Sequence, residues 1–406
     1  MRQRMILARD AAVVVVLIGL ALVLLGGLSR QLPPALYGEH GGDAWFEADI
    51  PRVLANMTSM ASNHYRTKVH PIASIVTHPI VQGMRAIWPG SDIQAALRFI
   101  LLVAALWVAA FYALCRLIGA RWWEAVCFCA LAIGSAAFQF WFSVPETFAL
   151  GSLSLLLTLL VGATAVHRPV SDRLLIAASA MSLSITVTNW VAGLAVAAAN
   201  RPWRRALRIS AIAFAIIAVI AVVQRLLYRL ALMFFLGSRE ELSYVNLAQS
   251  GTPLDKLAGM FWSPILAPLP QVKEALAPKL NWVTVQVSPI AADWQGIVSL
   301  ALWTVLLVAG ARGLLRLPQW RRFALVVGVT LASQVVLHLF YGEETFLYAA
   351  HFLPLLMVVT VFARHSELGR IAPVMALVAG GMAAFENAET FAFAAAKLTQ
   401  WSPHLQ

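Results

Sequence analysis

Long apolar runs recur along the whole chain and predict its secondary structure. A transmembrane helix needs about 20 predominantly apolar residues. Nine runs approach or reach that length without Asp, Glu, Lys or Arg: 11–28, 99–114, 125–145, 147–166, 209–223, 297–311, 323–341, 345–363 and 371–385. No linker, low-complexity tract or internal repeat divides them. The pattern therefore predicts an all-α fold, with one polytopic integral membrane domain over residues 1–406.

The composition agrees with this interpretation and excludes a water-soluble enzyme. Of the 406 residues, 60% are hydrophobic and only 12% are charged, whereas soluble proteins have about 25% charged residues. The formal net charge of +11 would suggest a nucleic-acid partner in a soluble protein. Here the basic residues cluster in short connections between apolar runs, so no nucleic-acid partner is expected.

The arginine clusters predict the orientation in the membrane. The amino terminus and the connections around 116–121, 168–173, 201–208, 312–322 and 364–370 hold 17 of the 30 basic residues, but only four of the 19 acids. Because cytoplasmic loops are enriched in Lys and Arg, we expect the amino terminus and these connections to be cytoplasmic. The alternate connections, including the long ones at 29–94 and 228–293, are then extracytoplasmic.

The alternation of cytoplasmic and extracytoplasmic connections also decides how two ambiguous stretches are interpreted. Residues 69–89 are apolar but contain two prolines and two histidines, and a span there would invert every later cluster, so we expect an interfacial segment. Residues 173–200 must cross and return as two short helices with a polar tip at Thr186–Trp190. Such a hairpin indicates a cavity open to the outer face, because unpaired backbone at membrane depth needs protein or water around it. The prediction is about 11 transmembrane segments and an outer carboxyl terminus.

The candidate chemistry lies among the acids of the outer connections. Asp43 and Glu47 are four residues apart on a segment that could be helical, where they would share one face, whereas Asp49 would point elsewhere. One interpretation is a solvated acidic loop, and the other is a general base with a supporting carboxylate. Glu146 follows a proline at the start of a helix. It could simply pair with the helix dipole or have a functional role.

Two further groups accompany these acids. Arg66, Lys68 and His70 lie in the first long connection, and Glu343, Glu344, Tyr348 and His351 lie at and after a late outer turn. His78 and His338 lie on apolar faces, and we interpret them as core residues with satisfied hydrogen bonds.

The order of these features resembles the GT-C superfamily of polytopic membrane glycosyltransferases, which includes protein O-mannosyltransferase-like and aminoarabinose transferase-like enzymes. The resemblance covers roughly residues 1–235 and returns at 341–356. Its motifs are Gly42-Asp43-Ala44, Tyr65-Arg66-Thr67-Lys68-Val69-His70-Pro71, Cys115-Arg116-Leu117-Ile118-Gly119-Ala120-Arg121, Pro145-Glu146-Thr147, Thr188-Asn189-Trp190, and Tyr-Gly-Glu-Glu-Thr-Phe-Leu-Tyr-Ala-Ala-His-Phe-Leu-Pro.

The resemblance implies an inverting transfer of a sugar from a polyprenyl-phosphate carrier to an acceptor on the extracytoplasmic side. Asp43 matches the family's base, and Glu146 matches the second acid, which positions the acceptor or a metal. The substrate or the lipid phosphate would contact Arg66, Lys68, His70, Glu343, Glu344, Tyr348 and His351. Whether a divalent cation (Mg²⁺ or Mn²⁺) serves as a cofactor stays open, because Asp43 is followed by alanine where many relatives have a second acid. Asp43 and Glu146 would be its ligands.

The expected partners are a polyprenyl-phosphate-linked sugar, membrane lipids and an acceptor that is a glycan, a lipid or a protein. The expected location is a bacterial inner membrane with the active site facing the periplasm. Three other classes are compatible with a polytopic chain: a transporter or flippase of a lipid-linked or small solute, a polysaccharide polymerase or ligase, and an inactive scaffold. The absence of a repeat and the acids at the outer surface favour the transferase over the transporter, whose site would lie near the midplane.

Overall fold

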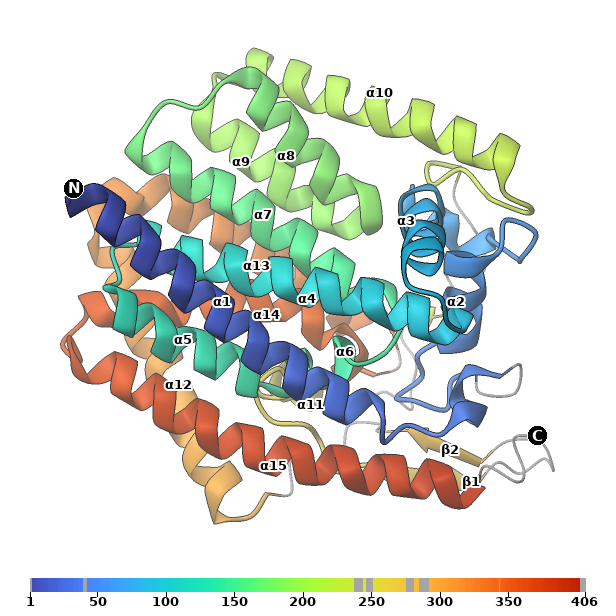
Figure 1. The fold of residues 1–406 in the computed structure, drawn as a ribbon. Helices are drawn as coiled ribbons and strands as arrows, with labels where there is room; N and C mark the ends of the chain where they lie inside the picture. Colours follow the sequence, from blue (N-terminus) through green and yellow to red (C-terminus); the bar gives the residue numbers. More distant parts are fainter. Residues whose placement is uncertain are drawn as a thin grey trace.

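The computed structural model describes residues 2–38, 42–236, 244–245, 251–274, 281–284, 292–342 and 344–401. Nearly all of the regular structure is helical (Figure 1). The long helices are α1 (Arg2–Ser29), α4 (Asp92–Leu117), α7 (Thr147–His167), α10 (Trp203–Leu227), α12 (Trp294–Arg316), α13 (Arg321–Phe340) and α15 (Ile371–Trp401). The shorter α-helices are α2 (Ile50–Thr58), α3 (Ala73–Ile87), α5 (Trp122–Gly134), α6 (Ala136–Trp141), α8 (Asp172–Ile185), α9 (Trp190–Asn200), α11 (Pro253–Trp262) and α14 (Ala349–Val361).

Eight helical segments in the described part of the chain are long and apolar enough to cross a membrane. They correspond to α1, α4, α7, α10, α12, α13, α14 and α15, which confirms a predominantly helical integral membrane protein. The remaining expected crossings are shorter helices: the pair α5 and α6, and the hairpin of α8 and α9. The total of about 11 therefore stays a prediction.

Two details differ from the expected elements. The last helix does not end near residue 385 but continues to Trp401. The connection at 228–293 contains α11 and also two short strands, β1 (Gln271–Glu274) and β2 (Asn281–Thr284), which pair antiparallel.

The expected segment 125–145 is broken into α5 and α6 at Ser135, which ends one helix and caps the next. The backbone groups freed by the break find partners in distant segments. The amide of Ala136 donates to the carbonyl of Ile265 at 3.1 Å. The Asn387 side chain donates to the carbonyl of Gly134 at 2.9 Å. A broken helix is stable at membrane depth only when protein supplies such partners.

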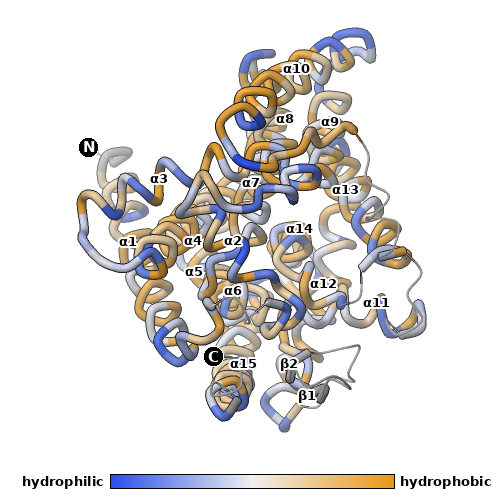
Figure 2. Tube along the Cα trace, turned by 90° about the vertical axis from the view of Figure 1, so that its right-hand side faces the viewer, coloured by the Kyte–Doolittle hydropathy of each residue, from blue (hydrophilic) through white to orange (hydrophobic). Residues whose placement is uncertain are grey.

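The first long connection contains α2, the 3-10 helices η1 (Pro34–Tyr37) and η3 (Tyr65–Lys68), and α3. Figure 1 shows α3 nearly end-on while α1, α4 and α15 run across the picture, and in the turned view of Figure 2 α3 extends sideways. It has 15 residues, includes Pro79 and is not one of the eight candidate spans. This orientation agrees with the expected interfacial segment, which stays a prediction.

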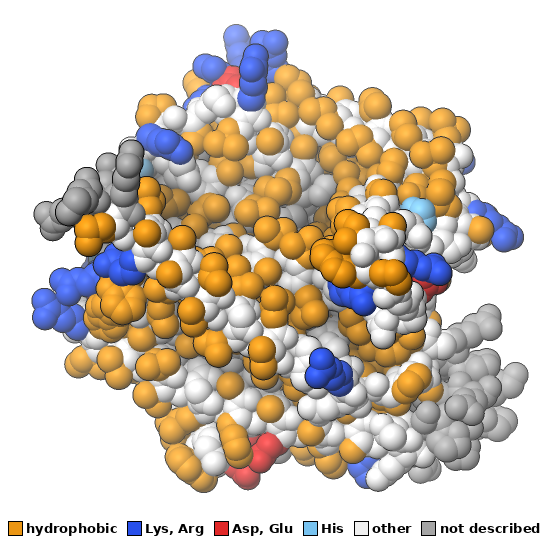
Figure 3. All heavy atoms as spheres, viewed as in Figure 1, with side chains coloured by type: hydrophobic (Ala, Val, Ile, Leu, Met, Phe, Trp, Pro, Cys, Tyr) orange, Lys and Arg blue, Asp and Glu red, His pale blue; other side chains and the backbone are white. Residues whose placement is uncertain are grey.

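The arginine-rich connections gather at one end of the long helices, together with the start of α1. Arg116 pairs with Asp10 at 2.9 Å, and Arg364 pairs with Glu124 at 3.1 Å. In Figure 3, hydrophobic side chains cover much of the middle of the visible face, and most Lys and Arg side chains lie toward its edges. The charge asymmetry in the sequence therefore corresponds to a separation in space.

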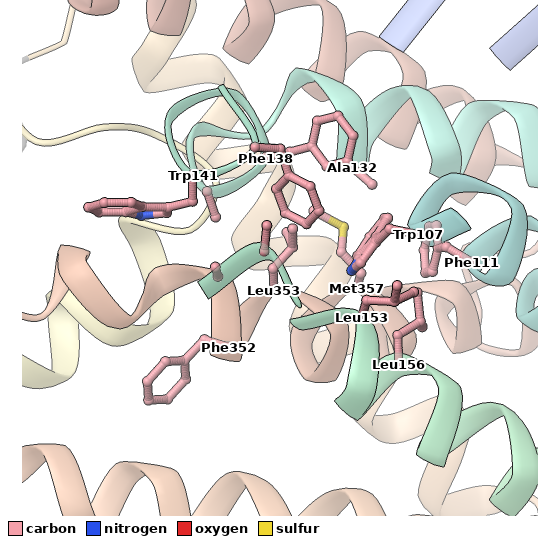
Figure 4. Close-up of a cluster of buried hydrophobic side chains, with 14 of the residues drawn as sticks. Trp107, Phe111, Ala132, Phe138, Trp141, Leu153, Leu156, Phe352, Leu353 and Met357 are labelled. Atoms are coloured by element: carbon pink, nitrogen blue, oxygen red, sulfur yellow. The ribbon is translucent and has the colours of Figure 1, made fainter. Parts of the chain in front are cut away.

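The helix α14 lies at the centre of the bundle, and its span is 89% buried. Figure 4 shows Met357 of α14 near Trp107 of α4 and Phe138 of α6. The indole of Trp107 donates to the Ser152 hydroxyl of α7 at 3.0 Å, so even the polar edge of this core is satisfied. The packing holds the amino-terminal turn of α14, which carries His351, in a defined position.

Candidate active site

A cavity of about 410 Å³ lies where the first long connection meets α7, the hairpin tip, α13 and α14. It is at the end of the bundle opposite to the arginine clusters, because Glu146 precedes α7 and His338 is near the end of α13. Its lining consists of Glu47, Ala48, Asp49, Arg52, Arg66, Lys68, Val69, His70, Glu146, Phe148, Thr186, Val187, Thr188, Phe234, Leu337, His338, Tyr341, Leu347, Tyr348 and His351.

Six residues predicted from the sequence meet in this cavity: Arg66, Lys68, His70, Glu146, Tyr348 and His351. The others do not line it. Asp43 is exposed on the turn that precedes α2, and Glu344 is buried outside the lining. Glu343 lies outside the described residues. The base role of Asp43 therefore stays a prediction.

The segment that carries Asp43 and Glu47 is a compact turn and not the helix that their spacing suggested. Asp43, Phe46 and Glu47 have φ angles of 61°, 51° and 59°, in the left-handed region that costs about 1–2 kcal/mol for an ordinary residue. Trp45 and Ala48 form an isolated bridge across the turn. The two acids consequently do not share a helix face, and only Glu47 reaches the cavity.

Buried aromatic rings hold this turn in place. The side chains of Trp45 and Phe46 are both 0% exposed. The Trp45 ring stacks on Phe140 of α6 with a centroid separation of 5.6 Å, and Phe46 packs against Phe346 at 5.2 Å. Such contacts offset the backbone strain, because burying an aromatic side chain contributes several kcal/mol. They fix where Glu47 and Asp49 enter the cavity.

Three cations line the cavity, and two of them lie over the same aromatic ring. Arg52 lies over the ring of Tyr65 at 5.5 Å, and Lys68 lies over the same ring at 5.1 Å. Arg52 also forms an ion pair with Asp49, three residues before it. Arg66 completes the set. This concentration of positive charge is suited to a phosphate group.

Glu146 caps the amino terminus of α7 and is only 2% exposed. Its carboxylate accepts from the amide of Thr147 at 2.7 Å and from the hydroxyl of the same residue at 3.3 Å. Burial raises the pKa of Glu146 from its ordinary 4.5 to about 7, against the opposing effect of Arg52. Glu146 therefore combines both interpretations of the sequence: it is a helix cap, and it faces the cavity with a perturbed pKa.

His70 contributes an acceptor rather than a cation. Its Nδ1 donates to the carbonyl of Ile185 at 2.8 Å, and the residue lines the cavity. Burial and the nearby Arg66 lower the pKa of His70 to about 3. The ring is therefore uncharged at neutral pH, so the positive charge of the cavity comes from Arg52, Arg66 and Lys68.

The cavity also contains residues to which the sequence assigned no function, Arg52, Thr186 and His338, together with Glu47 and Asp49, which were considered only as part of an acidic segment. Asp49 and Arg52 had one local signal, an acid and a base three residues apart at the start of an amphipathic helix. His338 was interpreted as a satisfied core residue. It is buried, but neither of its ring nitrogens has a hydrogen-bond partner among the described residues.

The described residues do not provide a recognisable metal centre. No group of three or more His, Cys, Asp or Glu side chains is placed there to hold an ion, and Asp49 is paired with Arg52.

A second cavity, of about 1100 Å³, adjoins the first and is largely apolar. It runs between α11, α12 and α13 over the surface of α14, and its wall includes Leu300, Leu307, Leu331 and Leu356. The two cavities share one wall segment, because Thr345 and Phe346 line the apolar cavity while Leu347 and Tyr348 line the polar one. We refer to the second cavity as the apolar groove.

Comparison with known proteins identifies the fold. No family model matches the sequence, and no curated protein matches it. The crystal structure of ArnT from Cupriavidus metallidurans bound to undecaprenyl phosphate is similar, with a TM-score of 0.56 and 14% sequence identity over 86% of this chain and 59% of that chain. The chain thus spans less than two thirds of the length of that ArnT chain. The likeness shows that this chain shares the overall fold of ArnT.

Proposed function

We propose that this protein is a membrane glycosyltransferase that moves a sugar from a polyprenyl-phosphate carrier to an acceptor on the extracytoplasmic side. The observation that carries the proposal is the polar cavity, in which the cations Arg52, Arg66 and Lys68 lie with the carboxylates of Glu47, Asp49 and Glu146. The GT-C-like fold supports it, because the similar ArnT structure contains undecaprenyl phosphate.

The proposed chemistry requires both kinds of charge. The acceptor hydroxyl attacks the anomeric carbon, a carboxylate takes its proton, and the bond from that carbon to the phosphate oxygen breaks. The electron pair leaves with the phosphate, which gains negative charge that the three cations stabilise. Attack opposite to the leaving phosphate gives inversion, as the resemblance implies.

We propose that the base is a carboxylate of segment 43–49. Asp43 is the candidate from the resemblance, but Asp49 and Glu47 are the ones that reach the cavity. Asp49 is also oriented by its ion pair with Arg52. We favour Asp49 as the base, with Glu146 positioning the acceptor.

We propose that the carrier occupies both cavities. Its phosphate lies near Arg66 and Lys68, and its polyprenyl chain lies in the apolar groove beyond the wall formed by residues 345–348. A lipid substrate needs such an arrangement, because polar or charged residues must bind its headgroup while its chain stays in an apolar environment. The arginine clusters at the opposite end favour a cytoplasmic amino terminus and a cavity that faces outward.

The test is transfer of radiolabelled sugar from undecaprenyl-phosphate sugars in membranes that contain the protein. We compare wild type with Asp49→Asn, Glu47→Gln and Asp43→Asn, and use Asp92→Asn as a matched control in an exposed ion pair. Removing a general base lowers the rate by roughly 10²–10⁴-fold, and we expect this for Asp49→Asn while Asp92→Asn retains full activity.

Two results would contradict parts of this proposal. A loss of transfer activity confined to Asp43→Asn would identify Asp43 as the general base in place of Asp49. Failure of every carrier to support transfer, together with solute flux driven by a gradient, would favour the transporter class.

A further inference from the structure

Three buried polar groups on the wall of the polar cavity have atoms without partners. The Thr186 Oγ1, the His351 Nε2 and both ring nitrogens of His338 make no hydrogen bond to any described residue. The side chains are 9%, 3% and 3% exposed, respectively. All three residues line the cavity. Because buried polar groups are nearly always hydrogen-bonded in folded proteins, these atoms indicate a polar ligand.

We propose that Thr186, His338 and His351 form the subsite for the transferred sugar and that this sugar is neutral, recognised through its hydroxyl groups. This inference rests on the proposed function. A hydroxyl and two imidazoles can each donate or accept, which suits sugar hydroxyls. A cationic amino sugar would instead call for a carboxylate among these groups, and a uronic acid would call for a cation.

The three residues come from elements other than those that carry the cations. Thr186 lies at the hairpin tip, His338 near the end of α13 and His351 in the first turn of α14. Arg52 belongs to α2, and Arg66 and Lys68 belong to η3. These three uncharged residues, which we call the uncharged wall, therefore reach the cavity from other elements than the cations do.

Aromatic rings border the uncharged wall. Tyr348 stacks on His338 with ring centroids 3.9 Å apart, and Phe148 meets His351 edge-on at 5.9 Å. Apolar faces beside hydrogen-bonding groups are the usual surroundings of an oriented small ligand. They match a sugar ring, which has hydroxyl groups at its edge and C–H groups on its faces.

Gly151 of α7 makes room for two of these side chains, which pack closely against its backbone. A Cβ at this position would lie 2.6 Å from the His351 Nε2 and 3.1 Å from the Thr186 Oγ1. Both unpartnered atoms thus face the same small region, and they are close enough for one hydroxyl group to bridge them. Any side chain at position 151 would displace the imidazole.

The test measures lipid binding to the purified full chain in lipid nanodiscs. The probes are radiolabelled undecaprenyl phosphate, undecaprenyl-phosphate glucose, undecaprenyl-phosphate mannose and the undecaprenyl-phosphate derivative of 4-amino-4-deoxyarabinose. For wild type we expect at least one neutral sugar to bind about tenfold tighter than the lipid phosphate alone, as hydrogen bonds to otherwise unpaired groups predict.

The variants separate the sugar from the phosphate. Thr186→Val, His351→Phe and Gly151→Ala should remove most of the gain in binding affinity that the sugar provides. The same variants should leave the affinity for the lipid phosphate alone unchanged. Thr186→Ser and His351→Gln, which keep a polar atom, should retain part of it. Arg66→Gln should weaken all of the lipids to a similar degree.

Two matched controls test for general effects. Thr330→Val removes a buried hydroxyl of α13 that is bonded within its helix at 2.7 Å, and Gly328→Ala adds a methyl group with nothing within 4 Å. Both should bind like wild type.

The possible failures are distinct. If the lipid phosphate binds but no neutral sugar adds affinity, or if Thr186→Val and His351→Phe leave the sugar's contribution intact, the subsite is wrong and the proposed function stands. Tighter binding of the amino sugar than of either neutral sugar would overturn the neutral class. If no lipid phosphate binds, the proposed function fails as well.

Discussion

Glu146 offers a direct test of how the polar cavity is built, because its carboxyl group is buried without an ion pair of its own among the described contacts. The substitution Glu146→Gln keeps the shape and an acceptor for Thr147 but removes the charge. Burial raises the pKa of this carboxyl from 4.5 to about 7. At about 1.36 kcal/mol per pKa unit, this corresponds to about 3 kcal/mol of folding stability.

The sign of the pH dependence follows from linkage. Below pH 4.5 the carboxyl is protonated in both the folded and the unfolded chain, so it has no effect on stability. Between pH 4.5 and about 7 the unfolded chain loses its proton while the folded chain keeps it, and the stability of the wild type falls. Above about pH 7 the loss is complete. Glu146→Gln does not titrate and should avoid this loss.

The assay is thermal unfolding in detergent at pH 5 and pH 8. We expect Glu146→Gln to raise the Tm relative to wild type at pH 8 by a few degrees and to have little effect at pH 5. Glu124→Gln is the matched control, because Glu124 is also buried near a helix start but pairs with Arg364 at 3.1 Å. It should destabilise at both pH values by about 3–5 kcal/mol. An identical pH dependence for wild type and Glu146→Gln would refute the reasoning.

Three further predictions concern the fold and its orientation. Gly380→Ala should destabilise the protein by about 1–3 kcal/mol, since its Cβ would meet the Cα of Leu131 at 2.6 Å. Gly381→Ala, with nothing within 4 Å of its Cβ, should be neutral. Equal Tm values for the two variants would argue against close packing of α5 and α15. Trp45→Ala should lower the free energy of unfolding by about 3–5 kcal/mol and lower transfer activity, because it releases the turn before α2. Trp203→Ala, at a position that is 67% exposed, should change neither stability nor activity. A stable, active Trp45→Ala variant would show that the turn needs no aromatic anchor. In intact cells, a membrane-impermeant maleimide should label Asn63→Cys and not Arg204→Cys. Background labelling should be low because the three native cysteines are buried. The reverse labelling pattern would contradict the proposed orientation.

Much of the site was predictable from local sequence signals. The Arg66–His70 segment, Glu146 and the Tyr348–His351 turn were all singled out, and all of these reach one cavity. They were recognisable because charged or polar residues are rare in this chain and lie where apolar runs end. The hairpin at 173–200 was also predictable, since its length is fixed by arginine clusters on both sides. Its tip lines the cavity through Thr186, Val187 and Thr188.

The choice among the acids was not predictable. The spacing of Asp43 and Glu47 suggested one helix face, but the chain turns at these residues with positive φ angles. That conformation depends on Trp45 and Phe46, whose partners Phe140, Phe346 and Phe391 are between about 90 and 350 residues away in the sequence. No local propensity contains this information, so only tertiary packing decides that Glu47 and Asp49 face the cavity.

The amino-acid sequence alone predicts a helical membrane protein whose charges separate into two ends. Hydropathy and arginine clustering are local properties, and the bilayer acts on each segment through them. The tertiary structure decided which side chains share a cavity, because that depends on contacts between distant helices. His338 illustrates the difference: one residue on an apolar helix looks like core, and only the packing of α13 against α14 and the hairpin leaves its ring nitrogens without partners among the described residues.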